Sequence, residues 1–491
     1  MRARPQNAAD LDARYREALR LIDAGRWDEA RAMLTRLAME APKSPEIPVQ
    51  LARLAGYAGD TAARIRFTDR ALALKPSEPA LLDAAIAAHS VAGDHGAVLA
   101  LHDRRIAVAK TPLHAATDKA LYLQHTGRFA EAEELVRDLI DRNPCEGVLY
   151  RTLYATLRVS EDDPTLPRLE RLLARSDAPD QSRLNAHFAM AKALEDMGRH
   201  GEVFANLDTA NDLQGAAAPY DHAATLREHA AFRAAQADAD LSPLPGMSDP
   251  RPVFVIGPPR SGTTLAERIL GAHPGVTAGG ELAHALKLVW QGFVKGDKVA
   301  PLRELRPPAL QALGRNYLAR VRADTGAARG VVTDKSIQSH LCIGFLARAL
   351  PGARFVSIRR DPRDTALSIY KNHFRTGTHR YSTDLRDIAL SIQAHRDSMA
   401  FWAERLPDRL IEITYEDLVS DPGTTAPKLA AAAGLDFAPE SLDFHRSEST
   451  VRTLSVAQAR APLHAGRKEA WRRYETELQP FIDAWGDRPW D

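Results

Sequence analysis

The chain has 491 residues, of which 45% are hydrophobic and 26% are charged, so it can form more than one domain with a substantial core. Its 65 Lys and Arg residues nearly balance 64 Asp and Glu residues, which excludes binding to nucleic acid or membrane surfaces through bulk charge. Two cysteines, Cys145 and Cys342, are too few for a disulfide framework or a thiolate metal site. The sequence shows no signal segment and no apolar run of about 18 residues, which predicts a cytoplasmic protein.

The first half contains a pattern that repeats every 34 residues. Glycines mark each period and prolines follow three of them, at Gly25, Gly59, Gly93 and Gly127 and at Pro42, Pro76 and Pro144. Glycine allows the turn between two helices to take a positive φ, and proline ends the second helix of a pair. This period is typical of tetratricopeptide repeats. We expect four repeats and one or two divergent helical pairs, forming an α-helical solenoid over residues 1–235. Its concave surface would bind a protein partner or acceptor, or the solenoid would only support the second half.

Residues 236–250 are rich in Pro, Gly, Ser and Asp, which predicts a linker before a second, separately folding domain at 251–491. That domain opens with an apolar run, a glycine loop at 257–264 (GPPRSGTT) and a helical stretch. A strand, a glycine loop and a helix in this order form an anion site, because backbone N–H groups converge at the positive end of the helix. Thr263 stands where a Walker loop has lysine, which disfavours a P-loop kinase or NTPase.

This loop resembles the 5′-phosphosulfate loop of sulfotransferases that use 3′-phosphoadenosine 5′-phosphosulfate (PAPS), where R-S-G-T-T is a recurrent form. Further segments resemble protein-tyrosine sulfotransferase motifs in the same order, at 272–276, 280–281, 333–335, 359–370, 414–418, 452–458 and 471–474. Over its whole length, the chain resembles bacterial proteins that join tetratricopeptide repeats to such a domain. The resemblance implies a P-loop-like three-layer α/β domain with a parallel sheet. It also implies transfer of a sulfuryl group from PAPS to an acceptor hydroxyl, with protein or peptide tyrosine favoured.

The resemblance implies four catalytic residues. Sulfuryl transfer needs groups that position donor and acceptor, neutralise the moving oxygens and accept the proton of the acceptor. Glu281 matches the general base. Arg260 and Lys335 match cations that contact the phosphosulfate, and Ser455 matches a serine that completes the surroundings of the transition state. His284 is a rival base, three residues after Glu281 and on the same helical face if that stretch is helical.

The resemblance also implies a nucleotide site. A strand ending near Ile358 would deliver Arg360 to the carboxyl end of the sheet, where open α/β sheets bind ligands. The motif match assigns Arg360 and Ser368 to the 3′-phosphate, while Arg363 helps them or pairs with Asp364. The implied nucleotide-binding residues are Arg260, Ser261, Gly262, Thr263, Thr264, Arg360, Ser368, Tyr415 and Arg460.

Several questions stay open at this stage. Peptides, glycans, lipids and small phenols all offer an acceptor hydroxyl, and the second half could instead be a degenerate nucleotide-binding domain in a non-enzymatic adaptor. Residues 464–471 depart from the pattern of the repeat-containing sulfotransferases, so the contacts of the C-terminal arginines with the nucleotide stay open. No metal is expected, because the 17 histidines show no spacing typical of metal ligands.

Overall fold

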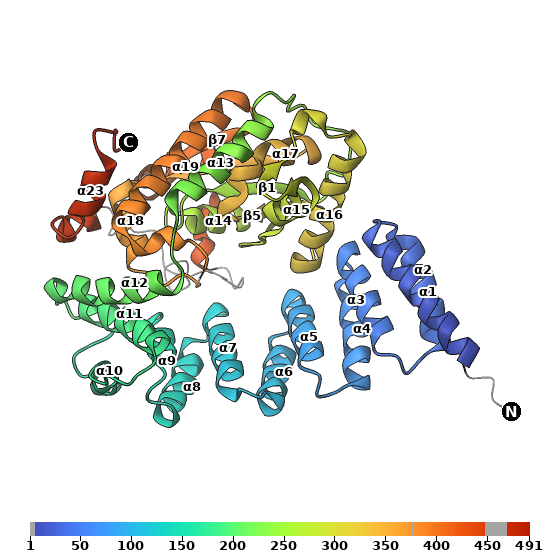
Figure 1. Ribbon diagram of the computed structural model, residues 1–491, viewed down its shortest axis with the longest axis horizontal. Helices are drawn as coiled ribbons and strands as arrows, with labels where there is room; N and C mark the ends of the chain where they lie inside the picture. Colours follow the sequence, from blue (N-terminus) through green and yellow to red (C-terminus); the bar gives the residue numbers. More distant parts are fainter. Residues whose placement is uncertain (1–4, 376, 447–468) are drawn as a thin grey trace.

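The computed structural model describes residues 5–375, 377–446 and 469–491 (Figure 1). The first region consists of helices that pack mainly as successive pairs. They are α1 (Pro5–Asp23), α2 (Trp27–Glu40), α3 (Glu46–Ala58), α4 (Thr61–Leu74), α5 (Pro79–Ala92), α6 (His95–Val108), α7 (Pro112–His125), α8 (Phe129–Arg142), α9 (Gly147–Tyr154), α10 (Leu166–Leu173), α11 (Asp180–Asp196), α12 (Val203–Ala217) and α13 (His222–Ala237).

The four repeat glycines all lie in turns between paired helices. Gly25, Gly59, Gly93 and Gly127 have φ values from +72° to +82°, and Gly198 repeats this conformation after α11 with φ +78°. A side chain is strained in this left-handed conformation, so the turns favour glycine. The repeating helical region that the 34-residue period predicted is confirmed.

The second region contains a five-stranded parallel sheet with the order β2-β5-β1-β6-β7. Its strands are β1 (Arg251–Ile256), β2 (Val276–Ala278), β5 (Val331–Asp334), β6 (Arg354–Arg359) and β7 (Leu410–Thr414). The central strand β1 is apolar along nearly its whole length because helices cover both faces of the sheet. Val253 and Val255 point into one hydrophobic cluster, and Phe254 and Ile256 point into the other.

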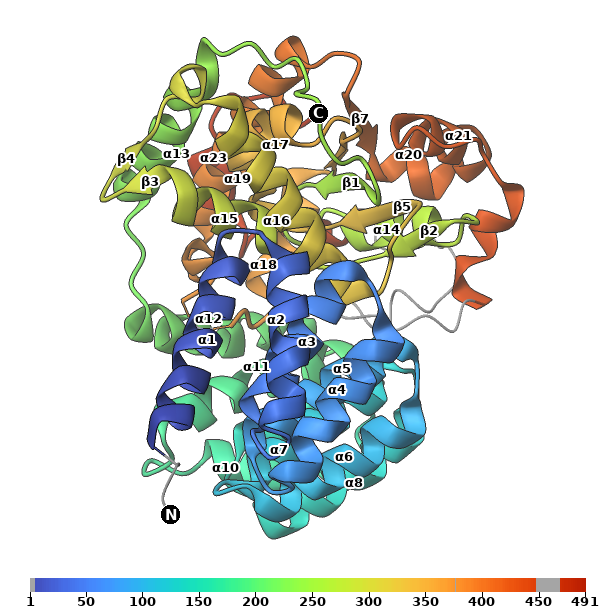
Figure 2. The ribbon, with the colours of Figure 1, turned by 90° about the vertical axis from the view of Figure 1, so that its right-hand side faces the viewer.

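Two helical layers enclose this sheet (Figure 2). One layer contains α14 (Thr263–Gly271), α20 (Tyr415–Ser420) and α21 (Pro422–Ala432). The other contains α15 (His284–Phe293), α16 (Pro307–Thr325), α17 (Ile343–Ala349) and α19 (Leu385–Arg405). The expected three-layer α/β architecture is confirmed.

The remaining elements include α18 (Pro362–Tyr370), α23 (Gln479–Trp485), the hairpin of β3 (Val294–Lys295) and β4 (Lys298–Val299), and 3-10 turns η1 (His200–Glu202), η2 (Leu302–Glu304), η3 (Ile337–Cys342), η4 (Arg380–Thr383), η5 (Pro439–Arg446) and η6 (Ala470–Tyr474).

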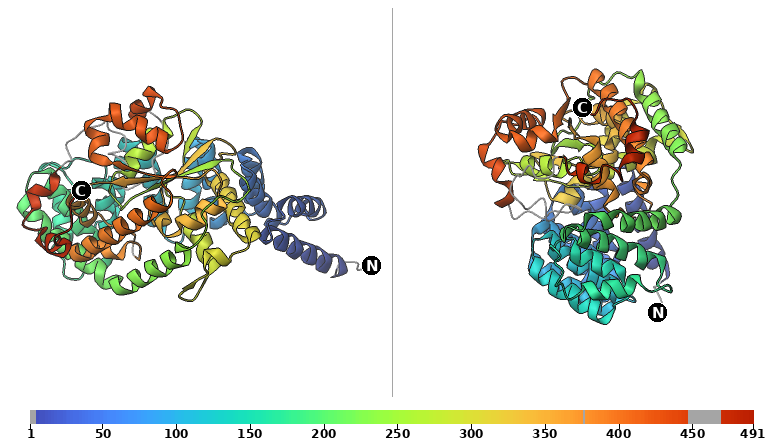
Figure 3. Two further views of the ribbon diagram at one scale, coloured as in Figure 1. Left: turned by 90° about the horizontal axis from the view of Figure 1, so that it is seen from above. Right: turned by 90° about the vertical axis from the view of Figure 1, so that its left-hand side faces the viewer.

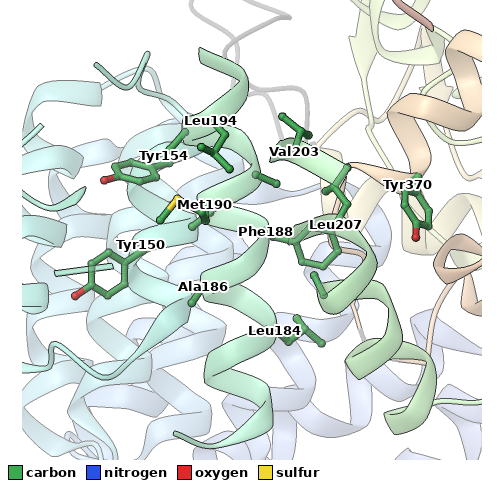
Figure 4. Close-up of a cluster of buried hydrophobic side chains, with 14 of the residues drawn as sticks. Tyr150, Tyr154, Leu184, Ala186, Phe188, Met190, Leu194, Val203, Leu207 and Tyr370 are labelled. Atoms are coloured by element: carbon green, nitrogen blue, oxygen red, sulfur yellow. The ribbon is translucent and has the colours of Figure 1, made fainter. Parts of the chain in front are cut away.

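The two regions share a hydrophobic core. One buried cluster runs from α7 through α12 into α18, α19 and α23. The ring of Phe204 stacks on that of Tyr370 with centroids 5.7 Å apart, and the side-chain amides of Asn211 and Gln214 donate to the Tyr370 and Phe374 carbonyls. Figure 4 shows Phe188 of α11 directed toward α12, which carries Leu207, and Tyr370 on the other side of α12. Because the two regions share this packing, a deletion experiment must test whether each folds separately.

A second contact joins the other end of the helical arc to the sheet region (Figures 1 and 3). Helix α3 packs on α16, where a Cβ added at Gly56 would lie 3.2 Å from the Cβ of Ala323. Small residues on both sides therefore allow the close approach. Helix α13 also packs on the sheet region, since the amide of Gln236 donates to the Leu341 carbonyl and accepts from the Gly344 N–H. None of the described helices combines the length and apolar character needed to span a membrane.

Candidate functional site

The carboxyl ends of the five parallel strands meet at one edge of the sheet and gather the predicted residues there. The glycine loop follows β1, Lys335 follows β5, Arg360 follows β6, Tyr415 follows β7, and the segment with Glu281 follows β2. Residues far apart in the sequence therefore lie at the edge where open α/β sheets bind ligands.

The glycine loop is shaped by two positive φ values and by a close neighbour. Arg260 has φ +69° and Gly262 has φ +101° at the start of α14. A Cβ at Gly262 would lie 2.3 Å from a ring carbon of Tyr415, so the ring packs directly on the loop backbone. The first N–H groups of α14, which have no acceptor four residues earlier in the helix, follow this turn. The loop has the shape required to hold a phosphate-like group.

Arg260 of the loop lies together with two further predicted nucleotide-binding residues, Arg360 and Ser368. The Nε of Arg260 donates to the Oγ of Ser368 at 3.0 Å, and an Nη of Arg360 donates to the Arg260 carbonyl at 3.0 Å. The Arg360 guanidinium lies 4.7 Å from the Tyr415 ring centroid, a cation–π contact. The loop arginine, the second arginine and the serine of α18 thus form one cationic cluster.

Asp364 lies behind this cluster. Its carboxylate is 3.7 Å from Arg360 and accepts hydrogen bonds from the N–H groups of Glu469 and Trp471. Burial is the main cause that raises the pKa of Asp364, while Arg360 acts in the opposite direction. Asp364 therefore links the segment entering η6 to the predicted 3′-phosphate residue.

Glu281 and Lys335 form an ion pair on the other side of the loop. The Nζ of Lys335 donates to Oε1 of Glu281 at 2.7 Å. The lysine side chain is only 3% exposed, whereas the glutamate side chain is 51% exposed. The carboxylate thus faces solvent at the edge of the site, while the ammonium group lies beneath it. This arrangement fits a base that meets an incoming acceptor and a cation that meets a donor.

Two local expectations are corrected by the structure. Glu281 and His284 do not share a helical face, because Ala283 has φ +55° and α15 begins only at His284. His284 instead pairs with Asp324 at 2.6 Å. Arg363 pairs with Asp361, at 2.6 Å, instead of Asp364, because Asp361 is the N-cap of α18 and its side chain turns back to the first turn, where it also accepts from the Arg363 N–H.

The remaining predicted residues lie in the loop, on the surface or outside the described part of the chain. Ser455 and Arg460 lie outside the described residues. Thr263 and Ser261 lie buried in the loop, and Thr264 lies in the first turn of α14. Arg472 pairs with Glu469 on the surface, at 2.9 Å.

The structure also adds residues that sequence reasoning missed. Glu267 is buried in α14 beneath the segment of Glu281. His379, in the loop after α18, has φ +46°. Burial lowers the pKa of His379, and electrostatic attraction to Glu281 opposes this effect. The only sequence signal for Glu267 was its position four residues, about one helical turn, after Thr263. No sequence signal pointed to His379. Across the part of the chain that the structure describes, no cluster of three His, Cys, Asp or Glu side chains could hold a metal ion.

The chain is similar to several known proteins. Residues 252–439 match the family model described as "Sulfotransferase family". An uncharacterised protein of Aquifex aeolicus is 30% identical over 378 residues, which cover 74% of this chain and 48% of that protein. Protein-tyrosine sulfotransferase 1 of Danio rerio is 25% identical over 189 residues, which cover 35% of this chain and 49% of that protein. The chain thus spans about half the length of each of these relatives.

Among solved structures, the sulfotransferase domain of the Synechococcus PCC 7002 olefin synthase is 18% identical. It aligns with a TM-score of 0.34 over 50% of this chain and 98% of that domain. The family match coincides with the region that begins at β1 and contains the glycine loop, the Glu281–Lys335 pair and the Arg360–Ser368 cluster. Over residues 252–439, this chain is similar to the sulfotransferase family.

Proposed function

We propose that the protein is a PAPS-dependent sulfotransferase that transfers a sulfuryl group to an acceptor hydroxyl, with protein or peptide tyrosine as the acceptor. The observation that carries this proposal is the placement of two charged groups on either side of one glycine loop. A cationic cluster of Arg260, Arg360 and Ser368 lies on one side, and the Glu281–Lys335 pair lies on the other.

The residues present fit a nucleotide that carries anionic groups at two positions. The loop backbone and Arg260 would hold the 5′-phosphosulfate, where Gly262 leaves no room for a side chain beside Tyr415. Arg360 and Ser368 would hold the 3′-phosphate. Because Arg360 also donates to the Arg260 carbonyl, binding at one phosphate would order the residue that binds the other. PAPS supplies an activated sulfuryl group, and the protein supplies position and charge.

In the proposed transfer, the acceptor oxygen forms a bond to sulfur while the bond from sulfur to the bridging phosphate oxygen breaks. The electron pair of the broken bond stays on the bridging oxygen, to which Lys335 donates a hydrogen bond. The acceptor proton moves to the carboxylate of Glu281. Because Lys335 bonds Oε1 of Glu281 in this structure, the acceptor hydroxyl would donate to the other carboxylate oxygen, Oε2, before transfer. Ser455 is proposed to assist, as the family resemblance implies.

Support for a tyrosine acceptor comes from the similarity to protein-tyrosine sulfotransferase 1 of Danio rerio. We further propose that the repeat region binds the protein acceptor or a protein partner. Helical repeats offer an extended concave surface for a peptide, and this arc contacts the sheet region through α3 and α12.

The test is transfer from ³⁵S-labelled PAPS to tyrosine-containing peptides, with matched peptides that carry Phe in place of Tyr as the control. Label on the tyrosine peptides alone would support the proposal. Binding of PAPS without transfer to any peptide, phenol or sugar hydroxyl would instead indicate a nucleotide-binding adaptor. Tight binding and hydrolysis of ATP with Mg²⁺, without use of PAPS, would indicate a P-loop NTPase.

A further inference from the structure

A buried carboxylate lies directly beneath the segment that carries Glu281. Glu267, on α14, is 6% exposed, and its Oε1 accepts a hydrogen bond from the Gly280 N–H at 2.9 Å. The same oxygen accepts a hydrogen bond from the Oγ1 of Thr333, on β5, at 2.8 Å. One side chain thus ties the helix that follows the glycine loop to the strand that leads to Lys335 and to the residue before Glu281.

The segment 279–283 is otherwise joined to the end of β5 through its main chain. The Gly279 N–H donates to the Thr333 carbonyl at 3.1 Å, and the Lys335 N–H donates to the Gly280 carbonyl at 2.8 Å. The Ala283 N–H donates to the Oγ of Ser336 at 2.7 Å. Glu267 adds the bond to the N–H of Gly280, immediately before Glu281. Loss of that bond would free the peptide group between Gly279 and Gly280, one residue before Glu281.

Glu267 also lies close enough to a buried cation, Lys335, to interact with it electrostatically. A buried ammonium group needs a nearby negative charge. The carboxylate that bonds the ammonium group of Lys335 belongs to Glu281, whose side chain is half-exposed. Burial is the largest cause that raises the pKa of Glu267, and attraction to Lys335 is the first cause that opposes it. On the far side of β5, Asp334 accepts hydrogen bonds from Tyr317 and Ser336. Glu267 is therefore a second carboxylate within electrostatic range of Lys335.

We propose that Glu267 is a positioning residue for Glu281 and Lys335. Its bond to Gly280 holds Glu281 in register with β5, and its negative charge balances Lys335 when Glu281 takes up the acceptor proton. The second part rests on the proposed function, whereas the first part does not.

Two substitutions separate these roles. Glu267→Gln keeps an oxygen that can accept from Gly280 and Thr333 but removes the charge, and Glu267→Ala removes both. Amide hydrogen exchange over residues 279–283 reports the position of the segment without any turnover. Binding of 3′-phosphoadenosine 5′-phosphate (PAP) by calorimetry reports the nucleotide site. The matched control is Asp163→Asn, since Asp163 is a partly buried, hydrogen-bonded carboxylate of the repeat region.

Glu267→Ala should accelerate exchange of the Gly280 and Glu281 amides and lower kcat about 10²-fold through misplacement of the base. Glu267→Gln should keep exchange protection and lower kcat about 10-fold with little change in KM for PAPS, as expected for a lost charged contact. Asp163→Asn should lower thermal stability while leaving exchange over 279–283 and turnover unchanged.

Unchanged exchange over 279–283 in Glu267→Ala would overturn the positioning role. Wild-type kcat in Glu267→Gln would overturn the charge role. If the wild-type protein transfers no sulfuryl group, the proposed function fails, and the exchange measurement still decides the positioning role.

Discussion

Helices α1–α6 and α7–α12 both belong to the helical repeat region but differ in how they pack against the rest of the molecule. The buried residues of α1–α3 and of α4–α6 form two local clusters. From α7 onward, the buried residues belong to a cluster that continues into α18, α19 and α23. The repeat region therefore contains helices with a local core and helices whose core is completed by the sheet region.

This difference bears on the candidate site. Ser368 lies on α18, whose residue Tyr370 packs on Phe204 of α12 and donates to Asp208 of the same helix at 2.7 Å. The later repeats thus support the helix that presents a predicted 3′-phosphate ligand. The early repeats contact the sheet region through the packing of α3 on α16 and the smaller contact of α5 on α16.

The largest expected effect is that of deletion. Removal of residues 1–221 should expose the shared cluster and yield an aggregated or unfolded chain, because large apolar surfaces on α18 and α19 would lose their cover. Removal of residues 1–110 should leave a folded protein that binds PAP. Circular dichroism, thermal unfolding and calorimetry on both variants would decide. A folded, monomeric 222–491 fragment would contradict the shared-core account.

At the site itself, Glu281→Gln should lower turnover roughly 10²–10⁴-fold while leaving PAP affinity close to that of the wild type. The amide can neither accept the acceptor proton nor pair as an anion with Lys335. The same loss should appear in the variant that lacks residues 1–110, if the early repeats leave the site intact. Turnover within a few-fold of the wild type would reject Glu281 as the base, and His284→Asn would be the next variant to test.

Core truncations should reproduce the deletion result on a smaller scale. Phe204→Ala, in the shared cluster, should lower the free energy of unfolding of the whole protein by about 3–5 kcal/mol and weaken PAP binding. Leu34→Ala, in the first local cluster, should lower the stability of α1–α3 by about 2–5 kcal/mol with unchanged PAP binding. Denaturant unfolding followed by calorimetry measures both quantities. Equal losses of PAP affinity in the two variants would remove the distinction between early and late repeats.

A smaller effect is expected for donor selectivity. Arg360→Ala should weaken PAPS and PAP binding roughly 10- to 150-fold, because a charge-assisted hydrogen bond contributes about 1.5–3 kcal/mol. Adenosine 5′-phosphosulfate, which lacks the 3′-phosphate, should bind this variant about as it binds the wild type. The control is Arg359→Ala, since Arg359 pairs with Glu412. Equal losses for both donors would show that Arg360 acts through its bond to the Arg260 carbonyl.

Much of the local structure could be predicted from the sequence. The glycine period identified the turns, the apolar run before GPPRSGTT identified β1, and the motif order identified the strand ends at Lys335 and Arg360. These features depend on residues close together in the chain. The placement of Arg260, Arg360 and Ser368 in one cluster followed from the parallel topology, because adjacent parallel strands end at the same edge.

Other features depend on long-range packing and could not be predicted in this way. Glu267 looked like an ordinary helix residue, and its partners Gly280 and Thr333 are 13 and 66 residues away. The left-handed conformation of Ala283 separates Glu281 from His284, although no glycine stands at that position to signal a break. The shared core likewise joins helices whose apolar faces alone do not indicate which partner covers them.

The contact between Gly262 and Tyr415 has a consequence for which sequences can form this protein. Position 262 excludes other residues for two independent reasons, a φ of +101° and a ring carbon 2.3 Å from where a Cβ would lie. Gly25 and Gly93 have only the first constraint, since a Cβ at either position would meet nothing within 4 Å. Asparagine, which tolerates the left-handed conformation, should therefore be accepted at the two repeat turns and rejected in the loop. In a library that samples every substitution at all three positions, survival at position 262 would be confined to glycine even if Tyr415 also became smaller.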